Sequence, residues 1–179
     1  ALDGFDGWSS SYSDRESGTF GIFEAEAGNQ AVWLGYNAPT QPVDYISIYR
    51  NVDVPAGTEP IEFSVDFWIQ DSSSVEKRDW FDFGIYNRSG EYLGGVVFDN
   101  RDRSILRYFA NDWEAVENTG KKFDRGMDYT LSATIDLQNN SWSVFLDGDP
   151  LFQNRTLTTS NSTTDLGAIE VGWLSLIHI

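Results

Sequence analysis

Aromatic rings and carboxylates recur at every second position in two neighbouring segments, residues 61–69 and 79–87. Alternate residues of an extended strand point to the same side, so each segment would present rings beside carboxylates on one face. Flat rings stack on the apolar C–H face of a sugar, and carboxylates accept hydrogen bonds from its hydroxyls. The pattern therefore predicts a carbohydrate-binding face, to which one loop residue and one further strand residue could add contacts. The predicted ligand-binding residues are Trp68, Trp80, Tyr86, Asp66, Asp82, Trp113 and Arg107.

The same carboxylates permit a second interpretation, a glycoside hydrolase. Hydrolysis of a glycosidic bond needs only two carboxylates, and a separation of about 5 Å suits a retaining mechanism. Asp66 and Asp82 would reach that separation if their strands were adjacent, and Glu62 is a further candidate. A third interpretation is a non-catalytic adhesion or surface-structure domain, which would show an apolar patch without a groove.

Composition excludes several other classes. The chain has no Cys, which rules out disulfides, thiolate catalysis and Cys-based zinc sites. Its net charge of −16 argues against nucleic acids and anionic membranes as partners, and no apolar run is long enough to span a membrane. A cysteine-free chain fits a secreted, extracellular bacterial protein. The negative charge suits cations or neutral ligands, and the aromatic face makes a polysaccharide or oligosaccharide the predicted partner.

The last six residues, 174–179, resemble the translation of a transposon end used to prepare sequencing libraries. This resemblance predicts an environmental gene, a single native domain over residues 1–173, and a non-native tail that begins after Trp173. Further native domains could then follow residue 173. The only histidine, His178, lies in this tail, so native Ser-His chemistry and His-liganded metal hydrolysis are not expected.

Period-two alternation dominates the rest of the chain, whereas sustained helical periodicity is absent. About ten short strands separated by Gly, Pro and Asn turns predict an all-β fold, a two-sheet antiparallel jelly-roll β-sandwich. Helix is expected only as a turn or two near residues 112–118. Besides the two segments above and residues 129–135, the strand candidates are 20–26, 30–36, 44–50, 92–99, 104–110, 141–147 and 165–173.

One stretch is more specific than alternation. Residues 129–136, a polar Gln-Asn-Asn turn, residues 142–148 and residues 150–152 resemble the paired strands of laminin G-like domains, within the concanavalin A-like lectin and glucanase superfamily. In that arrangement Gly148 supplies the positive φ of a tight turn. The resemblance implies a jelly roll of the carbohydrate-binding-module type. Lectins, binding modules, glucanases, lyases and adhesion domains share this fold, so the fold alone does not select a function.

The same resemblance bears on metals and catalysis. Many jelly-roll carbohydrate modules hold a structural calcium near their termini, which implies Asp3 or Asp6 with Asp165 as ligands. Laminarinase-like members carry Glu-x-Asp-x-x-Glu on one strand, and this chain shares only part of that spacing at Glu24-Ala-Glu26. The resemblance therefore favours binding over hydrolysis.

Overall fold

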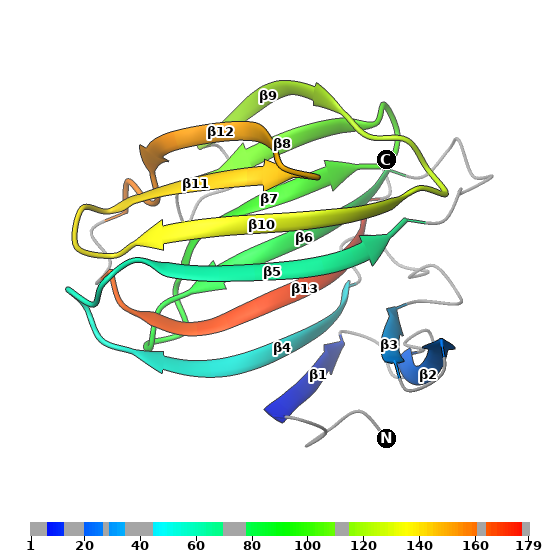
Figure 1. Ribbon diagram of the computed structural model, residues 1–179, viewed down its shortest axis with the longest axis horizontal. Coiled ribbons are helices and arrows are strands. Elements are labelled where there is room, and N and C mark those ends of the chain that lie inside the picture. Colours follow the sequence, from blue (N-terminus) through cyan, green and yellow to red (C-terminus); the bar gives the residue numbers. More distant parts are fainter. Residues whose placement is uncertain are drawn as a thin grey trace.

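The computed structural model describes residues 7–12, 20–26, 29–34, 45–69, 78–109, 115–160 and 164–176. Within these residues the chain forms two antiparallel sheets packed face to face, with a separate two-stranded hairpin beside them (Figure 1). The all-β sandwich predicted from alternation is confirmed. None of the described residues forms a helix long and apolar enough to cross a membrane.

The seven-stranded sheet has the order β1-β4-β13-β6-β7-β8-β9, the four-stranded sheet has the order β12-β11-β10-β5, and β2 pairs with β3. The strands are β1 Trp8–Tyr12, β2 Phe20–Glu26, β3 Asn29–Leu34, β4 Tyr45–Val54, β5 Ile61–Trp68, β6 Arg78–Tyr86, β7 Tyr92–Asp99, β8 Ser104–Tyr108, β9 Val116–Lys122, β10 Asp128–Asp136, β11 Ser141–Leu146, β12 Asp149–Thr156 and β13 Leu166–Leu176.

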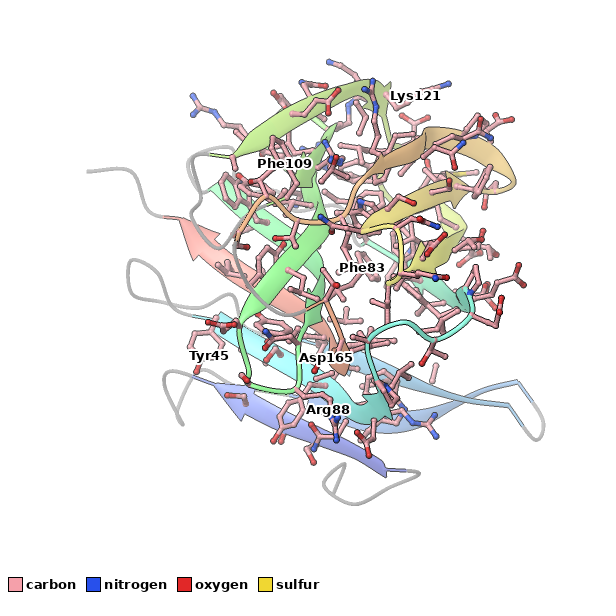
Figure 2. All side chains as sticks on the ribbon, turned by 90° about the vertical axis from the view of Figure 1, so that its left-hand side faces the viewer. Tyr45, Phe83, Arg88, Phe109, Lys121 and Asp165 are labelled. Atoms are coloured by element: carbon pink, nitrogen blue, oxygen red, sulfur yellow. The ribbon has the colours of Figure 1, made fainter. Side chains whose placement is uncertain are left out.

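Aromatic side chains from both sheets form the centre of the core. The ring of Phe67 on β5 lies 4.9 Å from the rings of Phe83 on β6 and Phe98 on β7, measured between centroids. Figure 2 shows the sandwich from its side, with Phe83 between the two layers. Because each strand alternates, one half of its side chains enters this core and the other half forms an outer sheet face.

The predicted hairpin in the second half of the chain is confirmed. β10 pairs with β11 from Leu131 opposite Leu146 to Asp136 opposite Ser141. Asp147 and Gly148 both have positive φ, 50° and 81°, which is the geometry of a tight hairpin turn leading into β12. The Asp-Gly signal therefore located this turn correctly.

Three local features differ from the expectations or qualify them. The helical turn near residues 112–118 is wrong for 116–118, which begin β9, while 112–114 lie outside the described residues. A strand was also not expected at β1. At the other end, β13 continues past Trp173, with Leu174 opposite both Tyr45 and Trp80. The foreign origin of residues 174–179 stays a prediction.

The pairing of β5 and β6 decides where the predicted site residues lie. These strands follow each other in the chain, but β5 pairs with β10 in the four-stranded sheet, whereas β6 pairs with β13 and β7 in the seven-stranded sheet. Their outer faces are therefore opposite surfaces of the sandwich.

Candidate functional site

The outer side of the seven-stranded sheet carries most of the rings and carboxylates that could form a site. Cross-strand registers place these residues on one face, because residues directly opposite each other in an antiparallel pair point the same way. We call this surface the tyrosine face. Its rings and carboxylates come from β4, β6, β7, β8 and β13, and they are Tyr45, Tyr49, Trp80, Asp82, Tyr86, Tyr92, Asp99, Tyr108 and Glu170.

Glycines make room on the tyrosine face for these large side chains. Gly84 lies opposite Gly95 across β6 and β7, and Gly172 lies opposite Asp82 across β13 and β6. A Cβ added at Gly95 would overlap the Tyr92 hydroxyl and would lie 2.7 Å from Oδ1 of Asp82. The Tyr92 ring and the Asp82 carboxyl therefore occupy the space that a side chain at residue 95 would need.

Asp82 is buried on this outer face, with 6% of its surface exposed. The Tyr92 hydroxyl donates a long hydrogen bond of 3.4 Å to its Oδ1. Burial raises the pKa of Asp82 from 3.8 to about 8; the charge of Glu170 adds to the rise, and the Tyr92 hydrogen bond opposes it. At neutral pH the carboxyl is therefore mostly protonated and can donate a hydrogen bond.

Tyr86 interacts directly with Glu170 on this face. Burial raises the pKa of its hydroxyl above 10, and both the charge of Glu170 and a hydrogen bond to that side chain raise it further. The Tyr86 ring also packs edge-to-face on Tyr92, with centroids 5.3 Å apart and planes inclined at 73°. The Tyr86 hydroxyl therefore remains a hydrogen-bond donor, and its position is set by contacts on both sides.

A shallow pocket of about 250 Å³ opens at one end of the tyrosine face. Two tyrosine rings, one carboxylate, side-chain amides and several small residues line it. The lining residues are Tyr49, Asn51, Tyr86, Asn87, Arg88, Gly90, Gly167, Ala168 and Glu170. Rings beside acceptors and donors in one concavity are the chemistry that a polar, ring-shaped ligand requires.

Trp80 belongs to the tyrosine face but is held by structural contacts. Its Nε1 donates to Oδ2 of Asp99 at 3.1 Å, and its ring lies 5.8 Å from that of Tyr108. Trp80, Val97 and Leu106 form part of a small apolar cluster on this outer side. The Trp80 indole therefore packs within the tyrosine face, and it does not line the pocket.

The predicted joining of Trp68 and Asp66 with Trp80 and Asp82 on one surface is wrong. Trp68, 53% exposed, and Asp66 lie on the outer side of the four-stranded sheet, where Oδ1 of Asp66 accepts a 2.6 Å hydrogen bond from Thr130. The expected pair of Asp66 and Asp82 is therefore not formed. Stacked sheets lie about 10 Å apart, and these carboxyls point away from each other on opposite sides of the two layers. Glu62 shares the outer face of Asp66.

The other predicted contacts also separate. Arg107 points from β8 toward the space between the sheets, since it lies opposite Val96 of the core. Trp113 lies outside the described residues. Of the seven predicted ligand-binding residues, the structure brings Trp80, Asp82 and Tyr86 together on one face. It places Trp68 and Asp66 together on the opposite face and turns Arg107 toward the space between the sheets.

The calcium prediction depends on residues that are not described. Asp3 and Asp6 lie outside the described residues, and Oδ1 of Asp165 accepts a 2.9 Å hydrogen bond from the Arg88 amide. Figure 2 shows Asp165 and Arg88 close together at one end of the sandwich. Within the described part of the chain, no three Asp, Glu, His or Cys side chains gather as a metal site. This hydrogen bond joins the segment before β13 to the turn after β6, which is a structural role for Asp165.

Sequence reasoning missed Tyr49, Asn51 and Glu170. The sequence did contain a signal for Tyr49 and Glu170. In residues 45–49, Tyr and Ser alternate with Ile, and Glu170 stands between the apolar residues Ile169 and Val171. Both patterns indicate a strand with one polar face. Both segments were expected as strands, but their faces were not assigned. Only the insertion of β13 between β4 and β6 brings Tyr49 and Glu170 beside Tyr86.

No protein-family model matches the chain, and no curated protein matches it. Solved structures do. The carbohydrate recognition domain of Emp46p, in its potassium-bound form, aligns over 96% of this chain and 82% of its own, with 14% identity and a TM-score of 0.57. Sheep galectin-11 in complex with glycerol aligns over 71% of this chain and 91% of its own, with 11% identity and a TM-score of 0.50.

A third solved structure is the CBM2 module of the evolved Dit protein of Lactobacillus casei BL23 phage J-1. It aligns over 79% of this chain and 68% of its own, with 11% identity and a TM-score of 0.51. At these identities the likeness concerns the fold. The chain has the two-sheet jelly-roll fold of concanavalin A-like lectins and carbohydrate-binding modules.

Proposed function

We propose that this chain binds carbohydrate at the tyrosine face, with a sugar ring seated in the pocket between Tyr49, Tyr86 and Glu170. The observation that carries the proposal is the pocket itself, in which two tyrosine rings and one carboxylate meet over small residues. The ligand is a polysaccharide or oligosaccharide, because the pocket is open and lies on a larger face rather than in an enclosed cavity.

The chemistry of the pocket suits a sugar. A tyrosine ring offers an apolar surface to the C–H face of a pyranose, and Glu170 accepts hydrogen bonds from hydroxyls. The Asn51 amide offers both a donor and an acceptor, which matches a hydroxyl of either role. Ala168 lines the pocket with a small side chain, so a flat ring could approach the backbone of β13.

The descriptions of two of the similar solved structures support this proposal. Two of them are described as a carbohydrate recognition domain and as a carbohydrate-binding module, and they share the fold over most of this chain. Their sequences are too different for residues to be transferred, so the site here is argued from this chain's own side chains.

A second candidate function, glycoside hydrolysis, is favoured by one specific observation. Asp82 and Glu170 are diagonal neighbours on β6 and β13, and the pKa of Asp82 is raised to about 8. Diagonal neighbours in a sheet lie about 7–8 Å apart, a spacing from which two carboxyl groups can reach the separation of about 6.5–9.5 Å found in inverting enzymes. A protonated Asp82 would act as the acid and Glu170 as the base, on a face other than that of the pair expected from sequence.

The test compares the two outer faces by affinity electrophoresis against soluble polysaccharides, with a glycan array to identify the sugar. Tyr49→Ala and Glu170→Gln should each weaken binding at least about tenfold, equivalent to roughly 1.4 kcal/mol. Trp68→Ala on the four-stranded sheet is the matched control and should bind as wild type. Circular dichroism must show that all three variants are folded.

The opposite pattern would refute the proposed site. If Trp68→Ala abolishes binding while Tyr49→Ala retains it, the outer face of the four-stranded sheet is the binding surface. Reducing-sugar release is measured in the same samples. Release that disappears in Glu170→Gln establishes the hydrolase, and absence of release from bound polysaccharide establishes a binding module.

A further inference from the structure

A second cavity, of about 230 Å³, lies away from the tyrosine face at an open edge of the sandwich. It forms where edge strand β9 of the seven-stranded sheet approaches edge strand β12 of the four-stranded sheet. Two arginines, a carboxylate and two amides surround it, with Leu151 and Phe152 supplying the apolar wall. The polar lining residues are Arg107, Glu117, Asn118, Thr119, Gln153 and Arg155.

Arg107 is the most buried charge at this cavity, with 5% of its side chain exposed. Nη1 donates to Oε2 of Glu117 at 2.7 Å, and Nη2 donates to the carbonyl oxygen of Thr156 at 2.5 Å. The guanidinium also lies over the Phe109 ring, 4.4 Å from its centroid. Nε has no hydrogen-bond partner among the described residues. The guanidinium is therefore firmly positioned, but one of its donors is unused.

Glu117 stands between two arginines. Besides its short contact with Arg107, its Oε1 lies 3.6 Å from Nη2 of Arg155. The side chains of Glu117 and Arg155 are 43% and 57% exposed, so both can rearrange without unpacking the core. A carboxylate between two guanidinium groups is the arrangement expected for a bound acidic ligand. Here the carboxylate is that of Glu117, a residue of the chain itself.

The charge distribution along the chain singles out this region. Residues 100–125, which include β8 and β9, hold six Lys and Arg against five Asp and Glu. The remaining residues hold six Lys and Arg against 23 Asp and Glu. An anionic ligand would meet less like charge near β8 and β9 than along the rest of the chain.

We propose that the β9–β12 cavity binds the carboxylate of an acidic sugar unit, a uronic acid. In the free protein the Glu117 carboxylate occupies the place between the two arginines, and the carboxylate of the ligand displaces it on binding. The inference rests on the proposed carbohydrate function only in taking a sugar as the carrier of the carboxylate. It makes the preferred polysaccharide an acidic one, contacted at two separate places.

The surroundings of the arginines fit this ligand. The guanidinium fork of an arginine matches the two oxygens of a carboxylate, and Arg155 is exposed enough to turn toward it. The Phe152 ring offers an apolar surface to the sugar, and the Asn118 and Gln153 amides can bond its hydroxyls. Pockets for drug-sized ligands begin at about 300 Å³, so this smaller cavity suits one monosaccharide unit.

The test is a titration of the isotope-labelled chain with sodium glucuronate, following the Nε–Hε resonances of Arg107 and Arg155 by nuclear magnetic resonance. Glucuronate should shift both resonances, whereas glucose and sodium sulfate at equal ionic strength should not. Glu117→Gln should strengthen glucuronate binding about tenfold, because it removes the competing carboxylate. Arg155→Gln should weaken binding by a similar factor, and the exposed Glu62→Gln is the matched control.

Two results would overturn the inference. One is the absence of glucuronate-induced shifts in both wild type and Glu117→Gln, and the other is an equal response to sulfate, which would indicate a general anion contact. Should Glu117→Gln fail to fold, the surface variant Arg155→Gln decides alone. Tyr49→Ala separates the two sites: it should leave glucuronate binding unchanged even where polysaccharide binding is lost, so the cavity and the tyrosine face can fail independently.

Discussion

The two outer sheet faces of this sandwich are built from the same alternation but differ in chemistry. On the four-stranded sheet, β10 presents Thr130, Ser132 and Thr134, small hydroxyl side chains that are exposed or half-buried. On the seven-stranded sheet, large rings surround a carboxyl, Asp82, of which only 6% is exposed. One face is an ordinary solvated surface, and the other has the packing of a small second core that contains a titratable group.

The difference arises from small residues rather than from the rings alone. Gly84 and Gly95 lie on the tyrosine face, and the space they leave admits the Asp82 carboxyl and the Tyr92 ring. A sheet face without such gaps would push the same side chains into solvent. Three predictions test this contrast, and their expected effects run from several kcal/mol to less than 0.5 kcal/mol.

The largest effect concerns the pH dependence of stability. The pKa of Asp82 is about 8 in the folded chain and 3.8 as an ordinary carboxyl, so between these values the folded state holds a proton that the unfolded state has lost. The free energy of unfolding should therefore fall as pH rises from about 4 to about 8, by up to about 1.4 kcal/mol per pH unit. Asp82→Asn, which cannot ionise, should remove this slope in urea titrations.

The control for Asp82→Asn is Asp66→Asn on the opposite face. Asp66 is exposed, so its replacement should leave the slope of wild type unchanged. Groups that face Asp82 are Glu170 on β13, Tyr86 on β6 and Tyr92 on β7. A slope that persists in Asp82→Asn would assign the titration to another group and remove the contrast between the faces.

The next effect tests the gaps directly. A Cβ at Gly95 would overlap the Tyr92 hydroxyl and lie 2.9 Å from the Phe83 carbonyl oxygen, which belongs to the backbone and cannot move aside cheaply. Gly95→Ala should therefore lower the free energy of unfolding by about 3 kcal/mol, the upper end for overpacking. Ser132→Ala on the four-stranded sheet should change it by less than about 0.5 kcal/mol. If Gly95→Ala and Ser132→Ala lowered the free energy of unfolding by similar amounts in denaturant unfolding, Gly95 would not be needed to make room on the tyrosine face.

The smallest effect is expected on the solvated face. The hydroxyl of Thr130 donates to Asp66 at 2.6 Å, but both residues are exposed. Thr130→Val should therefore cost less than about 0.5 kcal/mol, because water replaces the lost partner. A double-mutant cycle with Asp66→Asn measures the pair, and a coupling above about 1 kcal/mol would show that this face is also tightly organised.

The fold was predictable because alternation is a local property. Phe63, Phe67 and Phe83 were expected inside from period-two spacing alone, and Phe67 and Phe83 do meet across the two sheets. The turn at Asp147 and Gly148 was equally local, since positive φ is a preference of those residue types. The strand at Trp8–Tyr12 escaped notice because three consecutive serines carry no apolar alternation.

The site was only partly predictable because it depends on long-range pairing. Strand spacing predicted which side of β5 and β6 faces outward, but it did not reveal that these strands belong to different sheets. Trp68 and Trp80 therefore looked like partners in sequence and lie on opposite surfaces. Glu170 interacts with Tyr86 across a separation of 84 residues in the sequence, through strand pairing that no local pattern encodes.

The central place of β13 in the seven-stranded sheet has a consequence for how the chain folds during synthesis. β13 follows every other described strand in the sequence, yet it lies between β4 and β6. Until it leaves the ribosome, β4 and β6 each present an unpaired edge, and unpaired edges are where chains aggregate. Pairing at such sequence separations is also slow. The seven-stranded sheet can therefore close only after β13 has been synthesised, and until then its two parts expose strand edges that favour aggregation.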